Sequence, residues 1–531
     1  MAGDLHLIPF VIGVTGHRDV AAESIPLLEE SAGAVLSGLR KRMPSTPFLL
    51  LSGFAPCADQ IVARVALKHG AAVAAVLPMP RETYRATMER PGRDGFDELL
   101  PQASLVIDLE LVEGVSEQSL RQSEAHRALQ DEALGRFLAR YCQAAVALWD
   151  GEKGGIGDTA SVVEMIHEVG REVFRIVTPR EGQPPPRLPA GTIVPPDTAD
   201  TSEAHVAGSR LEALNRAAGR EINRGCPPYG GLLPAAEKID LPEFERRVAQ
   251  AFWAADQSSM LFGKSTKATF AKLLVLAFLA VASFEVYAHL FHDRHLLWFL
   301  YPVALFAAWV IHRRARKREV EVLYLECRSL AEALRTQFFW SLAGIRRSVA
   351  DAYLEHHCAE LEWIRVALRN VWLYSWQGHN PVLRGIELAR EHWVKHQANW
   401  FAGVAKKQKK TQDRVETLSE LFLWAVFIFS IVAPTYLLLA APGHETAQNR
   451  HGVLILLVTL PSLAVGLLRV WVERQGYAEQ ARAYHQMAEV FKKRIDGEEK
   501  TLEELGVEAL EENGDWLLLH RDRPLRVIGS T

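Results

Sequence analysis

Residues 273–291 read LLVLAFLAVASFEVYAHLF, an apolar stretch whose one acidic side chain is Glu285. Three more apolar stretches follow, at residues 296–311, 421–441 and 452–472. A helix of about 20 mostly apolar residues is long enough to cross the hydrocarbon core of a bilayer. Because the stretches come in two pairs, each joined by a short polar link, we expect four transmembrane helices arranged as two hairpins.

Basic residues lie on one side of these expected helices. They follow the second stretch and precede the third, at Arg313, Arg314, Arg316, Lys317, Arg318, Lys406, Lys407, Lys409, Lys410 and Arg414. The outer links hold Arg294 and Arg450. Short loops rich in Lys and Arg stay in the cytoplasm, so the sequence predicts a multi-pass protein of a bacterial inner membrane with both termini cytoplasmic. The alternative, two buried hairpins in a large soluble protein, gives no reason for this charge bias. The start of the sequence shows no signal-peptide pattern.

The composition argues against several classes of protein. The formal net charge of −4 does not fit a general nucleic-acid binder, which carries a basic patch or stripe. The five cysteines form no Cys-x-x-Cys pair, so we expect neither a disulfide framework nor a zinc site. His392 and His396 are spaced i, i+4 but lack a supporting motif, and we predict no metal and no resident cofactor.

The first part of the chain alternates short apolar runs with amphipathic segments. The runs lie at residues 8–14, 48–51, 71–77, 105–109, 144–149 and 173–177. The segments between them, at residues 24–42, 59–69 and 118–141, have helical patterns. Buried strands separated by helices are typical of a parallel sheet covered on both faces. We therefore predict a Rossmann-like, doubly wound α/β domain at the N-terminus, followed by an all-α membrane and cytoplasmic region.

Candidate ligand-binding residues follow three of these strands. They are Thr15, Gly16, His17 and Arg18 after the first strand, Ser52, Gly53 and Asp59 after the second, and Asp150, Gly151, Gly154, Gly155 and Thr159 after the fifth. Doubly wound sheets bind ligands beyond the carboxyl ends of their strands. Glycine exposes backbone amides, helix N-termini attract anions, and Arg18 is suited to a phosphate or carboxylate. Asp59 either caps the following helix or binds a ribose or base edge.

These three sets of residues together resemble one family. Val14-Thr15-Gly16-His17-Arg18, Leu51-Ser52-Gly53 with Ala58-Asp59, and Trp149-Asp150-Gly151 with Gly154-Gly155 and Thr159-Ala160 resemble the SLOG superfamily, nucleotide-sensing relatives of the LOG lysine-decarboxylase-like fold. The resemblance covers residues 7–178. It implies that the domain binds a nucleotide, an ADP-ribose-type product of NAD, or a cyclic nucleotide signal.

The enzymatic branch of that fold hydrolyses nucleoside monophosphates and carries a Pro-Gly-Gly-x-Gly-Thr-x-x-Glu loop. Here Lys153 stands where that proline would be, Asp158 is inserted before Thr159, and Val162 occupies the glutamate position. Glu164, two residues later, belongs to another face of the helix. The resemblance therefore implies a binding domain that is not an enzyme. The alternative is a membrane-tethered nucleotide hydrolase, with catalysis near Arg18, Asp59 and Asp150.

The rest of the chain divides by composition. We assign residues 1–180 to the nucleotide-binding domain, 181–240 to a Pro-rich linker and irregular segment, 241–312 to a stalk helix and the first hairpin, 313–420 to a cytoplasmic helical region, 421–472 to the second hairpin, and 473–531 to a C-terminal cytoplasmic helix and tail. The stalk pattern continues into the first apolar stretch. We expect the aromatic residues of the middle region to pack its helices against the C-terminal helices.

The membrane region also resembles a known type of domain. Each hairpin is followed by a charged amphipathic segment, and Trp393-Val394-Lys395-His396-Gln397-Ala398-Asn399-Trp400-Phe401 precedes the third stretch. Over residues 250–500 this pattern resembles the SLATT-type two-span effectors found beside SLOG sensors in bacterial conflict systems. The resemblance implies an antiphage effector that is a homo-oligomer in the lipid bilayer and binds a nucleotide second messenger. A nucleotidyltransferase or TIR-type enzyme encoded nearby would supply the messenger, which triggers permeabilisation or depolarisation. Glu285 is the candidate for the membrane path. A ligand-independent membrane scaffold or channel is the other interpretation.

The expected topology is testable by cysteine labelling. Cysteines introduced at Asp293 and Ala447 lie in the outer links, so a membrane-impermeant maleimide should label both in intact spheroplasts. A cysteine at Lys317 should react only after lysis, because this position follows the second span on the cytoplasmic side. Labelling at Lys317 before lysis, or release of the protein by carbonate washing, would contradict the topology.

Overall fold

The computed structural model of the protein describes residues 7–152, 155, 157–196, 203–221, 225–291, 293–353, 361–377, 382–439, 444–495 and 499–521. The chain folds as two compact units. The first unit consists of Met1–Ser258, Leu325–Ile386 and Gly506–Thr531, and the second consists of Ser259–Tyr324 and Glu387–Leu505. Each unit therefore combines segments that are far apart in the sequence.

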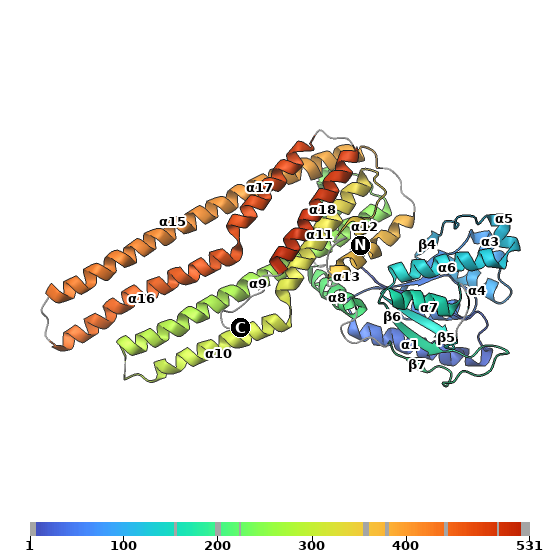
Figure 1. Ribbon diagram of the computed structural model, residues 1–531, viewed down its shortest axis with the longest axis horizontal. Helices are drawn as coiled ribbons and strands as arrows, with labels where there is room; N and C mark the ends of the chain where they lie inside the picture. The colour runs from blue at the N-terminus through green and yellow to red at the C-terminus, as the bar shows by residue number, and fades with distance from the viewer. Residues whose placement is uncertain are drawn as a thin grey trace. The chain divides into compact units, whose positions relative to one another are not determined.

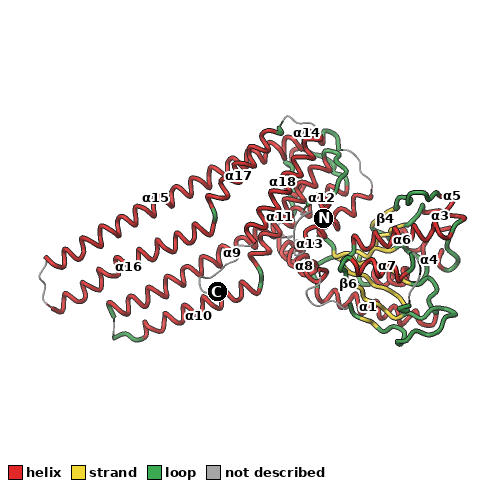
Figure 2. The backbone as a smooth tube through the Cα atoms, viewed as in Figure 1, coloured by secondary structure: helices red, strands yellow, loops and turns green. Residues whose placement is uncertain are grey.

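The first unit contains a seven-stranded sheet in the order β4-β3-β2-β1-β5-β6-β7. The strands are β1 (Phe10–Gly16), β2 (Phe48–Ser52), β3 (Ala72–Leu77), β4 (Leu105–Asp108), β5 (Ala144–Trp149), β6 (Glu172–Val177) and β7 (Ile193–Val194). Strands β1 to β6 pair in parallel, and β7 pairs antiparallel with β6. In Figure 2 the strands all belong to this unit. The six apolar runs of the sequence match β1 to β6 to within two residues, which confirms the predicted parallel sheet.

Helices cover both faces of the sheet (Figure 1). α1 (Ile25–Arg42) packs beside α2 (Ala58–Lys68), and α6 (Glu124–Tyr141) packs beside α7 (Thr159–Glu168). Because crossovers between parallel strands are right-handed, the two pairs lie on opposite faces. The sheet is thus doubly wound, and the strand order reverses direction between β1 and β5.

The predicted single helix at residues 118–141 is wrong in one respect. Two helices form there, α5 (Glu117–Gln122) and α6, because Ser123 between them is extended, with φ −118° and ψ 118°. The Ser123 hydroxyl accepts a hydrogen bond from the backbone N of His126 at 3.3 Å and caps α6. Two further short helices, α3 (Arg81–Ala86) and α4 (Gly92–Leu99), connect β3 to β4.

Helices from later in the chain complete the first unit. They are α8 (Glu203–Glu221), α11 (Val320–Leu342), α12 (Val349–Ala352), α13 (Glu362–Trp372) and α18 (Glu499–Arg521). The buried Asn370 of α13 donates a hydrogen bond to the carbonyl of Pro9 at 2.8 Å and exchanges hydrogen bonds with the side chain of Gln143. In α18, Asn513 donates to the carbonyl of Ser329 in α11 at 2.9 Å. The middle and C-terminal helices therefore pack together, as predicted.

The second unit consists of long helices. α9 (Glu243–His289) begins in the first unit and continues without a break through the first apolar stretch, so the predicted stalk is confirmed. α10 (Leu296–Lys317), α15 (His396–Leu439) and α16 (His444–Gln475) carry the other three stretches. α17 (Tyr477–Lys493) then packs against α15 through ring contacts of Tyr484 with Trp400 and Phe401. A short helix, α14 (Gly385–Ala389), and a π-helical turn, Arg390–Lys395, precede α15.

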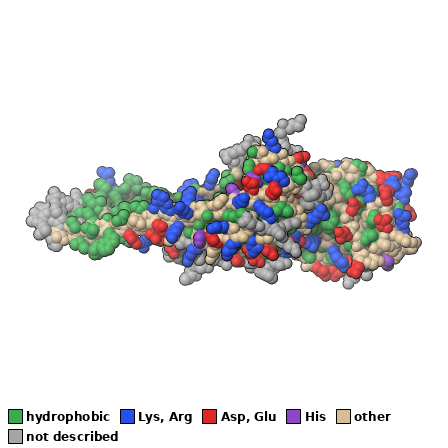
Figure 3. Space-filling view, turned by 90° about the horizontal axis from the view of Figure 1, so that it is seen from above, with side chains coloured by type: hydrophobic (Ala, Val, Ile, Leu, Met, Phe, Trp, Pro, Cys, Tyr) green, Lys and Arg blue, Asp and Glu red, His purple; other side chains and the backbone are tan. Residues whose placement is uncertain are grey.

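Among the described residues, four helices are long and apolar enough to cross a membrane, which confirms the predicted number. Their apolar windows have mean hydropathies of 1.5 to 2.3 and are 6% to 11% buried by the protein itself. Figure 3 shows hydrophobic side chains gathered over the ends of these helices, with Lys and Arg side chains beside that zone. Large side chains such as Phe422 and Trp424 are 50% and 64% exposed. Exposing so much apolar surface to water would be unfavourable in free energy. The surface is suited to contact with the lipid of a membrane.

After the second helix of each hairpin, one residue has a positive φ angle. Glu319 (φ 47°) lies between α10 and α11, and Gly476 (φ 60°) lies between α16 and α17. Near these two residues, Arg474 of α16 forms an ion pair with Glu321 of α11. On the same bundle, Phe270 of α9 stacks on Trp471 of α16 at 5.5 Å between ring centroids. Both second spans are thus followed by a residue with positive φ.

Gly16, at the end of β1, has a packing role that the sequence did not reveal. A Cβ atom at this position would lie 2.4 Å from Ala58 Cβ and 2.8 Å from the carbonyl oxygen of Leu148. Real carbon atoms do not approach so closely, so the absence of a side chain lets α2 and β5 close around the end of β1. By contrast, a Cβ at Gly38, in the exposed part of α1, would meet no atom within 4 Å.

We predict that Gly16→Ala lowers the free energy of unfolding by about 1–3 kcal/mol, the usual cost of overpacking a core. Gly38→Ala is the matched control and should leave stability unchanged or raise it by up to about 1 kcal/mol, because alanine favours helix. Thermal unfolding of the detergent-solubilised protein measures both. A Gly16→Ala variant as stable as the parent would show that the tight contact is not needed.

Candidate functional site

The candidate site is formed by the loops at the carboxyl ends of the strands, around the point where the strand order reverses. β1 ends at Gly16 and β5 ends at Trp149, and these ends are adjacent because Gly16 pairs with Leu148. The backbone N of His17 continues the pairing by donating to the carbonyl of Leu148 at 3.1 Å. α1 and α7 then leave toward opposite faces, so the side chains after β1 and β5 face the same opening.

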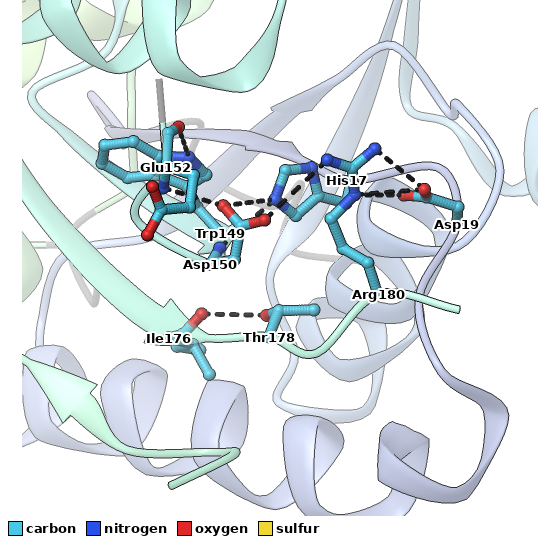
Figure 4. Close-up of polar contacts among 8 residues, drawn as sticks. All are labelled: His17, Asp19, Trp149, Asp150, Glu152, Ile176, Thr178 and Arg180. Atoms are coloured by element: carbon cyan, nitrogen blue, oxygen red, sulfur yellow. Dashed lines mark hydrogen bonds and ion pairs between the residues drawn. The ribbon is translucent and has the colours of Figure 1, made fainter. Parts of the chain in front are cut away.

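One group of charged side chains lies directly at this reversal point, and we name it the His17 cluster (Figure 4). It consists of His17, Asp19, Asp150 and Arg180. His17 Nε2 lies 3.1 Å from Asp150 Oδ1 and 3.2 Å from the backbone N of Asp150. These two contacts are alternatives: a protonated Nε2 donates to the carboxylate, whereas a bare Nε2 accepts from the amide.

Arg180 connects this cluster to the loop after β6. Its guanidinium forms a two-pronged hydrogen bond with Asp19, at 3.0 Å from Nε and 2.9 Å from Nη2, and its Nη1 lies 3.8 Å from Asp150 Oδ2. Burial acts to raise the pKa of Asp19, but the hydrogen bond and charge of Arg180 outweigh it and lower that pKa. The side chain of Arg180 is 35% exposed, so it can also reach a ligand.

A second group lies beside the first, and we name it the Arg18 cluster. It consists of Arg18, Asp59, Tyr84 and Asp131. Arg18 Nη2 donates to Asp131 Oδ2 of α6 at 2.9 Å. Burial acts to lower the pKa of the Arg18 guanidinium, and the charges of Asp131, Tyr84 and Asp59 reverse this effect and raise it. The Arg18 side chain is 52% exposed to solvent.

Asp59 holds the loop between β2 and α2. Its Oδ2 accepts a hydrogen bond from the Ser52 hydroxyl at 3.2 Å, and the backbone amides of Gly53 and Ala55 also bond to the carboxylate. Burial raises the pKa of Asp59 to about 6, against the opposing effects of Arg18 and these hydrogen bonds. The Asp59 side chain is buried, with 5% of its surface exposed. Asp59 lies in the first turn of α2 and binds the preceding loop.

Two residues of this loop have unusual backbone. Phe54 and Cys57 have φ of 53° and 62°, a region that side chains other than glycine rarely adopt. Non-glycine residues in this region cluster at ligand sites, where surrounding contacts hold them in place. Here the hydrogen bonds made by Ser52 and Asp59 supply those contacts.

The glycine-rich loop after β5 is shaped by close packing. Gly151 has φ 96°, and a Cβ there would lie 2.5 Å from Arg175 Nη1. Gly157 has φ 76°, and a Cβ there would lie 2.5 Å from the carbonyl oxygen of Ala128. The Asp158 carboxylate accepts a hydrogen bond from the backbone N of Gly155. Residues 153, 154 and 156, including the candidate Gly154, lie outside the described part of the chain.

The residues at the start of α7 have clear positions. Val162 is 5% exposed and packs against Gly135 of α6, whose ideal Cβ would lie 2.9 Å from Val162 Cγ2. Glu164 is exposed on the outer face of α7. Thr159 begins α7 and is buried. Val162 is therefore part of the packing between α6 and α7.

The structure brings most of the predicted residues to one edge of the sheet. His17, Arg18, Asp59 and Asp150 lie there as charged groups, and Thr15, Gly16, Ser52, Gly53, Gly151, Gly155 and Thr159 form the loop backbone and strand ends around them. Glu285 belongs to the second unit, in α9, where its Oε2 is 3.5 Å from His289 Nε2 one helical turn later.

Sequence reasoning missed Asp19, Tyr84, Asp131 and Arg180. Arg180 follows β6, just as the predicted residues follow β1, β2 and β5. The same rule, that polar residues after a strand can line a site, could therefore have found it. Asp131 and Tyr84 lie within helices, and their approach to Arg18 depends on how α3 and α6 pack, which periodicity does not reveal.

No protein-family model and no curated protein matches the sequence. Among solved structures, the chain is similar to DNA processing protein A (DprA) from Streptococcus pneumoniae, with 19% sequence identity and a TM-score of 0.23. The match covers 33% of this chain and 52% of that chain, so this chain spans about half the length of that protein. Similarity at this level says nothing about what this chain binds.

Proposed function

We propose that the protein is a membrane effector that senses a nucleotide-derived signal at the carboxyl-end loops of its sheet. The observation that carries the proposal is the pair of charged clusters at the strand-order reversal, where doubly wound sheets bind ligands. Arg180 and the half-exposed Arg18 provide charged donors for a phosphate, and nearby carboxylates provide acceptors for hydroxyl or amino groups. Nucleotides contain both kinds of group.

We further propose that ligand binding permeabilises or depolarises a bacterial inner membrane as antiphage defence. Support comes from α9, one helix that begins among the helices packed on the sheet domain and continues as the first membrane-length helix. The four apolar helices carry few ionisable groups from which a selective transport path is built. A ligand-gated pore made by several copies fits this composition better than a transporter does. The basic flanks support cytoplasmic termini, so the sensor would meet signals made inside the cell.

The test is a thermal-shift panel on the solubilised protein with cyclic dinucleotides, cyclic oligoadenylates, NAD and ADP-ribose derivatives. A ligand that binds the native state raises stability by mass action, by about 2.7 kcal/mol at a concentration of 100 times its Kd. We expect one class to raise the melting temperature, and Arg18→Ala to abolish that shift because it removes a charged donor from the site. Arg121→Ala, on the exposed face of α5, is the matched control and should keep the full shift.

Two results would overturn this proposal. If no nucleotide shifts the melting temperature, the membrane unit acts as a ligand-independent scaffold or channel. If the bound nucleotide is recovered as a hydrolysed product, the site is that of a hydrolase and the sensing role is wrong.

A further inference from the structure

The first hairpin, α9 with α10, carries an ionisable pair near its turn. The two helices lie side by side (Figure 1), and the rings of Phe284 and Tyr287 in α9 both contact the ring of Trp298 in α10, at 5.8 and 5.5 Å between centroids. Glu285 lies between Phe284 and Tyr287 in the chain, and its Oε2 is 3.5 Å from His289 Nε2. Trp298 therefore marks the level at which the apolar zone of the hairpin ends beside the turn.

A second tryptophan marks the opposite end of the apolar zone, beside the basic residues that follow the apolar stretch of α10. The guanidinium carbon of Arg313 lies 5.2 Å from the ring centroid of Trp309. In α9 the exposed Lys272 precedes the apolar stretch. Counted from the ring contacts near the turn, the same number of residues along each helix brings Lys272 level with residues 310–313. Trp309 and Lys272 therefore mark the basic end of the zone in the two helices.

The apolar zone between these two levels is short. At about 1.5 Å per residue, Trp298 and Trp309 are about 17 Å apart along α10, and Lys272 and Glu285 are about 20 Å apart along α9. Even the whole apolar stretch of α10, residues 296–311, is only about 24 Å long. The hydrocarbon core of a typical bilayer is about 30 Å thick. A tilt of the helices would shorten the distance that they cover still further.

The side chains at the two ends keep their polar groups close to these levels. A long cationic side chain can lengthen an apolar zone by reaching away from it, but the Arg313 guanidinium lies back over Trp309. Near the turn, His295 Nδ1 lies 3.2 Å from the Tyr287 hydroxyl oxygen. Polar atoms therefore bound the apolar zone of the first hairpin at both ends.

The second hairpin differs in length. Residues 421–439 of α15 include no charged residue and are about 28 Å long, so α15 fits an ordinary bilayer. A helix that is longer than the hydrocarbon core is accommodated by tilting, whereas a shorter helix draws the bilayer thinner. The mismatch with an ordinary bilayer therefore lies at the first hairpin, where Phe299, Val303 and Phe306 of α10 are more than half exposed.

We infer that the first hairpin fits a hydrocarbon core of about 20 Å and thins an ordinary bilayer around α9 and α10. The lipid that suits this surface is a phospholipid with short acyl chains. Glu285 and His289 set the boundary of the apolar zone near the turn, where they meet the headgroups. The inference concerns contact with lipid, and it holds whether or not the sheet domain senses a nucleotide.

The test measures which lipid the full chain prefers in liposomes. A dibrominated phosphatidylcholine quenches tryptophan fluorescence, and unbrominated phosphatidylcholines compete with it: dimyristoleoyl, dipalmitoleoyl, dioleoyl and dierucoyl, in order of chain length. Trp298, Trp309 and Trp424 are at least half exposed and report the lipid beside them. We expect the relative binding constant to be highest for the dimyristoleoyl lipid and about threefold lower for the dierucoyl lipid, because mismatch costs free energy with each added ångström.

The same assay tests where the short-chain preference arises. In Trp424→Phe the preference should remain, because the α10 tryptophans still report it. In the double variant Trp298→Phe/Trp309→Phe it should weaken, because Trp424 of α15 then supplies more of the signal. The opposite pattern would overturn the inference, since the thin region would then surround the second hairpin.

Substitution of the ionisable pair tests the boundary. Glu285→Leu combined with His289→Leu lengthens the uncharged run of α9 to residues 273–291, about 28 Å, so the preferred lipid should become longer. Glu285→Gln combined with His289→Gln is the matched control, and it should keep the preference of the parent because both positions stay polar. A parent protein that prefers the dioleoyl or dierucoyl lipid would overturn the inference without any variant. A preference that the leucine pair leaves unchanged would also overturn it.

Discussion

The parallel pairing of β1 with β5 is the contact on which the rest of the molecule depends. It places the last residues of both strands side by side and sends the chain away from them in opposite directions. The pairing is tight because Gly16 has no side chain and both strands are buried along almost their whole length. As a result His17 and Asp150, which are far apart in sequence, come within 3.1 Å. A charged site forms without any long loop to support it.

The amino ends of the same two strands are fixed to the helical part of the first unit. Gln143, just before β5, accepts from the backbone N of Val11 in β1 and bonds to Asn370 of α13. Asn215 of α8 donates to the carbonyl of Ile8, just before β1. Ser258 of α9 in turn donates to the carbonyl of Leu214 at 3.1 Å. These buried hydrogen bonds connect β1 and β5 to α9, and α9 continues as a membrane-length helix. Under the proposed function they are the route by which a ligand at the sheet would act on α9.

Much of this arrangement could be predicted from the sequence. The continuous apolar runs predicted the parallel strands, and the long apolar stretches predicted the membrane-length helices. The positions of His17, Arg18 and Asp150 directly after strands predicted that they lie at one edge of the sheet; that they bind a ligand stays a prediction. Contacts between distant segments could not be predicted in this way. Nothing in the local pattern says that Asp131 pairs with Arg18, or that residues 325–386 join the sheet domain, because these depend on helix packing in three dimensions. The break at Ser123 was also missed, since a single capping serine hardly alters the helical periodicity.

The central claim is that a ligand at the sheet changes the permeability of the membrane. The most direct measurement uses proteoliposomes with a potassium gradient and a voltage-sensitive dye, with the sheet domain facing the added ligand. The account predicts that a nucleotide that stabilises the protein collapses the membrane potential, and that the same nucleotide has no effect on liposomes containing Arg18→Ala. A membrane potential that stays unchanged while the ligand saturates the parent protein would contradict the account. The protein would then be a tethered sensor that passes its signal to a separate partner.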